Sequence, residues 1–326
     1  MKKRDIVNKH YETSLRGVGM EYIYGMTDIN QNEESVVVLG NFDGVHQGHQ
    51  KLLDVAKQYA SENGLKTIVF SFYPHPSWVI GQKPKALIMS RCDKKQMIKQ
   101  LGIDTLIEYP FTKSFANISP ERFFEEILIG QLKAKALVVG ENYYFGKDKA
   151  GNPAHLQLLG EAQNVKVFVV EAVKKDEKVI SSTNIRQLII AGNIEEANKL
   201  LGHPYMIFGT VTHGKQLGRT IGFPTINLVA DSDRVYPPNG VYATKVTVYN
   251  KTYVGMTNIG YNPTVNGSKK MIETHILDFD EEIYGEIVAL SFYKAIRPEQ
   301  KFKDIASLSE QIAKDKISIK QFFNYM

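Results

Sequence analysis

An apolar run that leads directly into a glycine-rich turn constrains the fold more than any other part of this chain. Residues 36–39 read VVVL, which is the pattern of a strand buried on both faces. Gly40 and Gly44 follow, and they free the backbone to turn sharply and to approach a ligand closely. Apolar residues then recur at helical spacing from Leu52 to Ala60. The stretch therefore predicts a buried strand, a glycine turn and an amphipathic helix.

Two histidines lie in this turn, His46 and His49, on either side of Gly48. The free N–H groups and the dipole of a helix N-terminus attract an anion. Imidazoles in that position donate hydrogen bonds to phosphate oxygens and stabilise the charge that develops as an α-phosphate is attacked. The lysine-bearing P-loop pattern does not occur in this stretch. A single loop histidine would usually have no chemical role, but a pair in this setting predicts a nucleotide phosphate site.

The composition bounds the class of protein. A length of 326 residues suggests two domains, and the net charge of +5 is mild, with no run of basic residues to mark a nucleic-acid face. The single cysteine, Cys92, excludes an internal disulfide and favours a reducing compartment, so we expect a cytoplasmic location. We find neither a signal-peptide pattern nor an apolar run of membrane-spanning length. We expect no nucleic-acid or membrane partner, and weak self-association stays open.

Between residue 35 and about residue 190, strand-like runs alternate with helical patterns. This alternation predicts a doubly wound, Rossmann-like parallel sheet with right-handed crossovers. One helix is expected from Ser90 to Gly102, and another has Ser119 as its N-cap and Gly130 past its end. The expected strands are residues 20–24, 35–39, 67–72, 105–108, 136–139 and 165–170.

Polar loops at the ends of these strands are expected to meet in one cleft, because ligands of such sheets bind beyond the carboxyl ends of the strands. A further segment, residues 180–186, looks like a helix start that Ser182 or Thr183 caps, and its hydroxyls together with Arg186 would suit a phosphate. For this segment alone, a plain capping run with a solvated arginine is the alternative. The cleft loops are residues 40–49, 73–76 and 140–151.

After a short helix at residues 194–200 the pattern alternates with period two, which predicts an antiparallel β-barrel with a closing helix from Ser307 onward. Each module is expected to fold alone. The expected strands are residues 207–212, 241–249, 253–258, 273–279 and 286–292, with a turn at Asn250-Lys251. The domain limits are an N-terminal extension of residues 1–17, a first module of residues 18–190, a linker helix of residues 191–202 and a second module of residues 203–326.

The second module has its own glycine-rich segment. Gly214 and Gly218 free the backbone and Lys215 adds positive charge, so the main-chain N–H groups could cradle phosphates. Thr225 and Asn227 are two residues apart, so on a strand their oxygens share a face. Two neutral oxygens there suit Mg²⁺ beside a nucleotide.

One acidic residue of the second module, Glu273, lies on an expected strand ahead of Ile276 and Leu277. A carboxylate in that place could act as general base for a hydroxyl. The alternative is that Glu273 faces solvent from the strand and has no chemical role.

Taken together, these segments resemble the bacterial bifunctional riboflavin kinase/FMN adenylyltransferases, usually called FAD synthetases, from about residue 18 to the C-terminus. In the first module the resemblance rests on residues 40–49 (GNFDGVHQGH), 72–76 (FYPHP), 139–146 (VGENYYFG) and 181–186 (SSTNIR). In the second module it rests on residues 218–227 (GRTIGFPTIN), 239–242 (NGVY), 258–260 (NIG), 263–264 (PT), 273–279 (ETHILDF) and 297–302 (RPEQKF).

The resemblance implies two reactions: ATP phosphorylates riboflavin to FMN in the barrel, and FMN attacks ATP in the parallel-sheet module to give FAD and pyrophosphate. Mg²⁺ would accompany ATP. The residues implied for catalysis are His46, His49, Arg186 and Glu273, and those for the metal are Thr225 and Asn227. The implied ATP contacts are Gly40, Phe42, Gly44, Gly48, Ser182, Thr183, Gly214, Lys215 and Gly218. The implied flavin contacts are Phe72, Pro74, His75, Pro76, Asn142, Arg297 and Phe302.

The chain departs from the family pattern in a few places. Asn184 stands where the family usually has arginine, and Ile226 stands where it usually has alanine. Tyr143 and Tyr144 make the third motif unusual. Two alternative functions stay open: an adenylyltransferase with an inactive barrel, or a flavin-binding regulator without catalysis.

Overall fold

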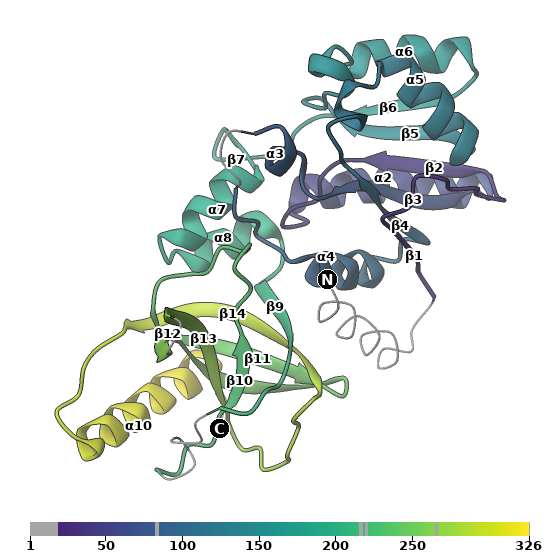
Figure 1. Ribbon diagram of the computed structural model, residues 1–326. Coiled ribbons are helices and arrows are strands. Elements are labelled where there is room, and N and C mark those ends of the chain that lie inside the picture. The colour runs from purple at the N-terminus through teal and green to yellow at the C-terminus, as the bar shows by residue number, and fades with distance from the viewer. Residues whose placement is uncertain (1–18, 82–84, 215–217, 219–220, 265–266, 326) are drawn as a thin grey trace. The chain divides into compact units, whose positions relative to one another are not determined.

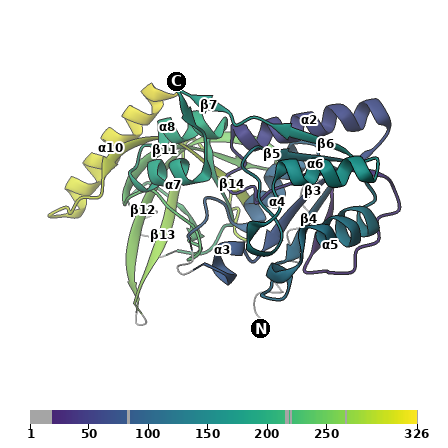
Figure 2. The same cartoon turned by 90° about the horizontal axis from the view of Figure 1, so that it is seen from above.

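The computed structural model describes residues 19–81, 85–214, 218, 221–264 and 267–325. Within these ranges the chain forms two compact units, which Figure 1 and Figure 2 show in two views. The N-terminal unit comprises Gly17–Ala86 and Lys94–Ser182, and the C-terminal unit comprises Leu87–Asp93 and Thr183–Met326. The expected extension of residues 1–17 lies outside the described residues.

The N-terminal unit is built on a six-stranded sheet, β1-β4-β3-β2-β5-β6, in which every neighbouring pair is parallel. This confirms the doubly wound fold. The strands are β1 (Glu21–Tyr24), β2 (Ser35–Leu39), β3 (Lys66–Tyr73), β4 (Thr105–Pro110), β5 (Ala134–Gly140) and β6 (Lys166–Val170), followed by a ribbon of β7 (Lys174–Lys175) and β8 (Lys178–Val179). The helical segments are α2 (Gln47–Asn63), α3 (Pro76–Val79), α4 (Arg91–Gln100), η1 (Phe115–Asn117), α5 (Pro120–Arg122), η2 (Phe123–Gln131), η3 (Lys147–Lys149) and α6 (Pro153–Ala162).

Strand β2 lies in the interior of this sheet, and all of its residues are buried. Helix α2 packs against β2, β3 and β5, and Gly64 ends it in the left-handed conformation. The strand therefore brings the glycine turn that follows it to the carboxyl edge of the sheet. The buried side chains of α2 are Leu52, Leu53, Ala56 and Ala60.

One helical run continues further than the sequence suggested. Ser119 caps it as expected, its Oγ accepting a hydrogen bond from the Arg122 N–H at 3.2 Å. Gly130, however, lies inside the run rather than past its end, within the π-helical segment η2. Phe124 and Leu128 are fully buried there, and this packing keeps the chain helical through the glycine.

The C-terminal unit is built on a six-stranded sheet, β10-β13-β12-β11-β14-β9, in which every neighbouring pair is antiparallel. A single bridge between Thr212 and Asn227 joins the two ends of the sheet, so it curls into a barrel. Figure 2 shows α10 beside β11 and β12, which confirms the closing helix. The elements are α7 (Ser182–Ile190), α8 (Ile194–Leu201), β9 (Tyr205–Thr210), β10 (Ile226–Val229), β11 (Gly240–Val248), β12 (Lys251–Thr264), β13 (Gly267–Ile276), β14 (Ile287–Pro298) and α10 (Ile305–Phe322).

Two local details of the barrel differ from the sequence expectation. The hairpin between β11 and β12 turns at Tyr249 and Asn250, one residue early, because Val248 already pairs with Lys251. Both turn residues have positive φ, as two-residue hairpin turns of this kind require. Strand β10 was not among the expected strands, and it begins at Ile226, so Asn227 lies on it and Thr225 precedes it.

The antiparallel sheet has two chemically different faces, because side chains alternate along each strand. The face toward α10 is apolar over much of its area. The opposite face, inside the barrel, holds a row of three buried threonine hydroxyls that are 2.8 Å and 2.9 Å apart. The side chains packed toward α10 are Val241, Ala243, Val254, Met256 and Leu277, with Ile319 from the helix, and the threonines are Thr244, Thr257 and Thr274.

A segment from the first half of the chain, Leu87–Asp93, belongs to the C-terminal unit. Leu87 forms a parallel bridge with Arg234, and Asp93 forms a buried ion pair with the same arginine. Because the guanidinium has a partner at every nitrogen, its desolvation is offset. A fragment of residues 203–326 would keep Arg234 in its core and lose this carboxylate. The three nitrogens of Arg234 donate to Asp93, the Tyr205 hydroxyl and the Met206 carbonyl.

We predict that Asp93→Ala in the full chain lowers the free energy of unfolding by about 3–5 kcal/mol, because it leaves the Arg234 cation buried without its partner. Calorimetry of the parent and variant measures the change. The matched control is Glu310→Ala, which breaks the exposed Glu310–Lys314 pair on α10 and should leave stability unchanged. Equal stability of the two variants would contradict a structural role for the Asp93–Arg234 pair.

Candidate active sites

The glycine turn of the N-terminal unit presents the paired histidines at the start of α2. His46 is the N-cap residue of the helix and His49 lies in its first turn. Their rings stack, with centroids 3.8 Å apart and an interplanar angle of 17°. The first turn of α2, which is described throughout, contains no acidic residue. Its N–H groups and dipole therefore suit an anionic ligand.

Close packing supports this turn. A Cβ on Gly40 would lie 3.1 Å from the Phe42 ring, and a Cβ on Gly48 would lie 3.1 Å from the His46 ring. Phe42 is fully buried, and its ring centroid lies 5.0 Å from that of His49. The burial of Phe42 suits support of the histidine pair, and its contact with ATP stays a prediction.

The start of α7 is fixed to the same turn. Ser182 Oγ donates a hydrogen bond of 2.8 Å to the Asp43 carbonyl, next to Gly44, whose φ of 88° turns the chain. Helix α7 begins at Ser182, so neither predicted hydroxyl residue precedes it as a cap. Thr183 and Arg186 follow along α7 and are grouped with the C-terminal unit. Their contacts with ATP stay predictions.

The electrostatic setting keeps His49 neutral. Burial, the neighbouring His46 and the Lys94 ammonium lower the pKa of His49 well below its ordinary value of 6.5. Among the described residues, nothing hydrogen-bonds to the buried Nδ1 of His49. A neutral imidazole still donates one hydrogen bond, so His49 is suited to contact a phosphate oxygen.

A cavity of about 980 Å³ is lined by residues of this turn and of the neighbouring loops. Aromatic rings form much of its wall, and the ring centroids of Phe72 and Phe111 lie 5.2 Å apart. An aromatic wall of this extent fits a flat aromatic ligand. The predicted site residues that line it are Gly40, Phe72, Pro76 and Asn142. The other aromatic residues of the wall are Phe115, Phe123, Tyr143, Tyr144 and Phe145.

Pro74 and His75 lie in the loop that leads to this cavity. The Tyr73–Pro74 peptide bond is cis. His75 is the N-cap of α3, and its Nδ1 accepts a hydrogen bond from the Ser77 N–H at 3.2 Å. His75 thus orders the loop, and direct contacts of Pro74 and His75 with a flavin stay predictions.

In the C-terminal unit, a cavity of about 340 Å³ lies on the face of the sheet that α10 covers. Arg297 donates from Nε to Asp315 of α10 at 2.9 Å, and its guanidinium carbon lies 5.6 Å from the centroid of the Phe302 ring. The structure therefore gathers a fixed guanidinium, aromatic rings and three carboxylates, those of Glu273, Glu299 and Asp315, around this space. The predicted site residues that line it are Gly218, Thr225, Glu273, Arg297 and Phe302.

Sequence reasoning missed His275, which lines the same cavity. Its Nδ1 donates to the Pro224 carbonyl at 2.8 Å, and burial is the largest cause that lowers its pKa. Neutral His275 thereby fixes the backbone just ahead of Thr225. The available signal was its position two residues after Glu273, which places both side chains on one face of β13.

Thr225 and Asn227 fit a divalent cation held together with a nucleotide. Asn227 is buried and pairs in register with Glu273. In the described part of the chain, the Oδ1 of Asn227 has no hydrogen-bond partner. Gly214 packs so closely that a Cβ on it would lie 2.3 Å from the Asn227 Nδ2. A buried, unsatisfied amide oxygen two residues along the chain from a hydroxyl side chain suits Mg²⁺, which takes its other ligands from water and phosphate. Lys215, a predicted ATP contact, lies outside the described residues.

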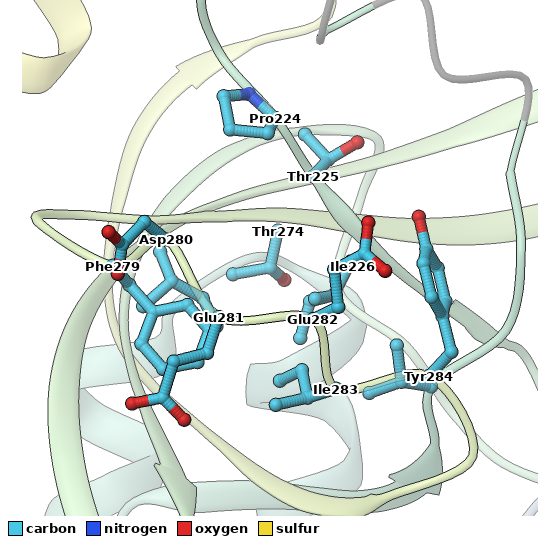
Figure 3. A pocket seen from close by; sticks show the side chains of 12 residues that line it. Pro224, Thr225, Ile226, Thr274, Phe279, Asp280, Glu281, Glu282, Ile283 and Tyr284 are labelled. Carbon is cyan, nitrogen blue, oxygen red and sulfur yellow. The ribbon is translucent and has the colours of Figure 1, made fainter.

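The barrel interior has a cavity of about 280 Å³ that the sequence did not reveal, because much of its lining comes from the loop after β13. Figure 3 shows Thr225, Ile226 and Tyr284 around it. Ile226 pairs with Thr274 on this inner face, and the Tyr284 ring stacks on His213 with centroids 3.8 Å apart. Thr225 lines both this cavity and the cavity under α10, so it stands between the two spaces.

Two family models match the chain, FAD synthetase over residues 28–184 and riboflavin kinase over residues 201–323. The fold and the family matches thus define a class of two-domain flavin enzymes, in which a parallel-sheet domain of the FAD synthetase type precedes a barrel of the riboflavin kinase type. The bifunctional riboflavin kinase/FMN adenylyltransferase of Bacillus subtilis is 42% identical, over 90% of this chain and 94% of that protein. The protein of the same name from Escherichia coli K12 is 35% identical, over 93% of this chain and 98% of that protein. The chain belongs to the family of bifunctional riboflavin kinase/FMN adenylyltransferases.

A crystal structure of a Streptococcus pneumoniae protein named macrolide-efflux protein is also similar. It is 34% identical, has a TM-score of 0.82 and matches 92% of this chain and 99% of that one. That name describes the other protein, and it assigns no activity to this chain. In the part of the chain that the structure describes, no helix combines the length and the apolar character needed to cross a membrane.

We predict that acid weakens the N-terminal unit partly through His49. Between its lowered folded-state pKa and its ordinary value of 6.5, the unfolded chain binds more protons, so the free energy of unfolding falls on acidification. Urea unfolding at about pH 7.5 and about pH 5.5, followed by the fluorescence of Trp78, should show a larger loss for the parent than for His49→Gln. An equal loss in both proteins would mean that folded His49 titrates normally.

Proposed function

We propose that this chain makes FAD from riboflavin in two ATP-dependent steps, phosphorylation in the C-terminal unit and adenylyl transfer in the N-terminal unit. Family membership supports both activities. The observation that carries the proposal is the stacked His46–His49 pair at the N-terminus of α2, in a turn whose residues also line a large aromatic cavity. We place the modules at residues 18–190 and 203–326, joined by a linker helix at 191–202, and we propose a cytoplasmic location because Cys92 is the single cysteine.

In the N-terminal unit, the flavin of FMN occupies the aromatic cavity and the ATP phosphates lie at the glycine turn. An FMN phosphate oxygen attacks the α-phosphorus of ATP, the bond to the bridging oxygen breaks, and pyrophosphate leaves. His46 and His49 donate hydrogen bonds to the α-phosphate oxygens, whose negative charge grows in the transition state. Ser182, Thr183 and Arg186 hold the triphosphate.

In the C-terminal unit, riboflavin lies under α10 and the ATP base lies in the barrel interior, with Thr225 between them. The 5′-hydroxyl oxygen attacks the γ-phosphorus, Glu273 takes the hydroxyl proton, and ADP leaves. Mg²⁺ held through Thr225 and Asn227 would neutralise charge on the transferring phosphate. Arg297 and Phe302 position the flavin ring.

The two alternative functions lose support at this point. The relatives carry the bifunctional name, and the family models match both halves of the chain. Thr225, Asn227 and Glu273 are all present, as an active barrel requires.

The proposal is tested by incubating the protein with riboflavin, ATP and Mg²⁺ and resolving FMN and FAD by chromatography. Both products are expected. A second incubation starts from FMN and ATP and follows pyrophosphate. FAD from FMN without FMN from riboflavin would refute the kinase step, and the absence of pyrophosphate would refute adenylyl transfer.

We predict that His49→Ala removes about 2.7–4 kcal/mol of transition-state stabilisation from FAD formation, the range for loss of one charge-stabilising donor. FMN formation from riboflavin should be unchanged, which makes it the internal control. The His46→Ala, His49→Ala double variant should lose at least as much. FAD formation at the parent rate in the double variant would show that the site is wrongly assigned.

We predict that Glu273→Gln lowers kcat for FMN formation by about 10²–10⁴-fold, the usual contribution of a general base. The side chain keeps its size, so the barrel should fold as before, and FAD formation from supplied FMN should persist. Glu310→Gln, on the exposed side of α10, is the matched control. Parent-like FMN formation by Glu273→Gln would exclude this carboxylate as the base.

A further inference from the structure

A buried polar network lies behind the glycine turn of the N-terminal unit. Lys94 Nζ lies 3.0 Å from Glu108 Oε1, and the two side chains are 9% and 0% exposed. Lys94 Nζ also donates to Ser71 Oγ at 3.2 Å. Ser71 Oγ in turn donates to the Asn41 carbonyl at 3.2 Å, and the Tyr22 hydroxyl donates to Glu108 Oε2 at 2.6 Å. None of these four side chains belongs to the site residues assigned above.

The direction of the hydrogen bonds in this network is fixed by chemistry. An ammonium only donates and a carbonyl only accepts, so Ser71 must accept from Lys94 and donate to Asn41. Tyr22, Glu108 and Ser71 lie on β1, β4 and β3, which are consecutive in the sheet. Asn41 follows β2, the next strand in that order. The network therefore ties the glycine turn to the sheet at the edge where the turn begins.

Stability alone does not account for this arrangement. A buried ion pair gains little over apolar side chains of the same size, because both charges lose their hydration. The Lys94–Glu108 pair is nevertheless buried in the sheet core, and its relay ends on the backbone of the loop that carries the histidines. The Lys94 charge also acts at that loop, since it is among the causes that lower the pKa of His49.

We propose that Lys94, Glu108 and Ser71 are positioning residues for adenylyl transfer. They hold the Asn41 carbonyl, and through it the turn, so that His46 and His49 meet the α-phosphate in its transition state. This inference rests on the proposed function of the N-terminal unit. It differs from a purely structural role, which would change how much protein folds but not the rate of each folded molecule.

Two variants separate these roles. The double variant Lys94→Met, Glu108→Gln removes both charges together, so neither is left buried and unpaired. Ser71→Ala cuts the relay to Asn41 and leaves the ion pair in place. We expect each to lower kcat for FAD formation from FMN by roughly 10- to 100-fold, since a misplacement of about 1 Å can cost about 10²-fold. The KM values for ATP and FMN should change little, because the histidines act mainly on the transition state.

The controls use the same protein. Lys135→Met breaks the exposed Lys135–Glu34 pair in this unit and should keep the parent kcat. Lys94→Arg retains a charge and a donor and should restore most of the rate. Because each unit is expected to fold alone, the amount of folded N-terminal unit is measured in every variant by urea unfolding, followed by the fluorescence of Trp78 in that unit. FMN formation from riboflavin is the control for the C-terminal unit.

The outcomes are distinct. A parent-like kcat for FAD formation in the double variant or in Ser71→Ala would overturn the inference. A loss of folded N-terminal unit that accounts for the whole fall in FAD formation would overturn it as well, because the network would then be structural. If the parent protein made no FAD, the proposed function would fail together with the inference. If the parent protein makes FAD, the results with the variants test the inference alone.

Discussion

The complete burial of β2 is the constraint on which the N-terminal unit depends. A strand without solvent contact needs cover on both faces, and parallel strands connected by helices provide it. The chain must then leave β2 at the carboxyl edge of the sheet, turn within a few residues and return as α2. The Phe42 and His46 rings pack closely against Gly40 and Gly48, where a Cβ would lie 3.1 Å from each ring and would require it to shift. The N-terminus of α2 and the two imidazoles are thus brought together by the need to cover one strand.

In the C-terminal unit, the alternation of side chains along each strand decides which residues share a face of the sheet. Asn227 and Glu273 share the face toward α10, whereas Ile226 and Thr274 share the barrel interior. Ile226, in place of the family's usual alanine, therefore lies on the opposite face from the proposed metal ligand Asn227. It lines the interior cavity, where the proposed function places the base of ATP. The substitution thus leaves the face that carries Asn227 and Glu273 unchanged, and we expect its effect on the binding of ATP.

Much of the fold follows from local sequence patterns. Strand β2 coincides with the expected strand, and Ser90 and Ser119 cap the helices that were expected to start there. One error has a local cause, because buried neighbours carried η2 past Gly130. The glycine turn and the loop after β3 follow strands of the parallel sheet, so their meeting at one edge followed from the topology.

What could not be predicted depends on residues far apart in the chain. The Asp93–Arg234 and Lys94–Glu108 pairs have no recognisable spacing, because buried partners meet only after folding. The interior cavity was hidden for the same reason, since its wall joins strand residues to the loop that carries Tyr284. The position of His275 on the same face as Glu273 could have been predicted from their spacing of two residues. Its hydrogen bond to the Pro224 carbonyl could not, because no sequence pattern indicates it.

Asp93 and Lys94 are neighbours on α4, yet each forms a buried ion pair in a different unit. A buried charge is stable only where its partner is in reach, so each pair permits one register of its segment. The chain passes between the units at this peptide bond as well as near Ala86 and Ser182. The two compact units are therefore not separated by a single cut in the sequence. The first half of the chain supplies the carboxylate that neutralises Arg234, and the barrel needs that carboxylate to keep a guanidinium in its core.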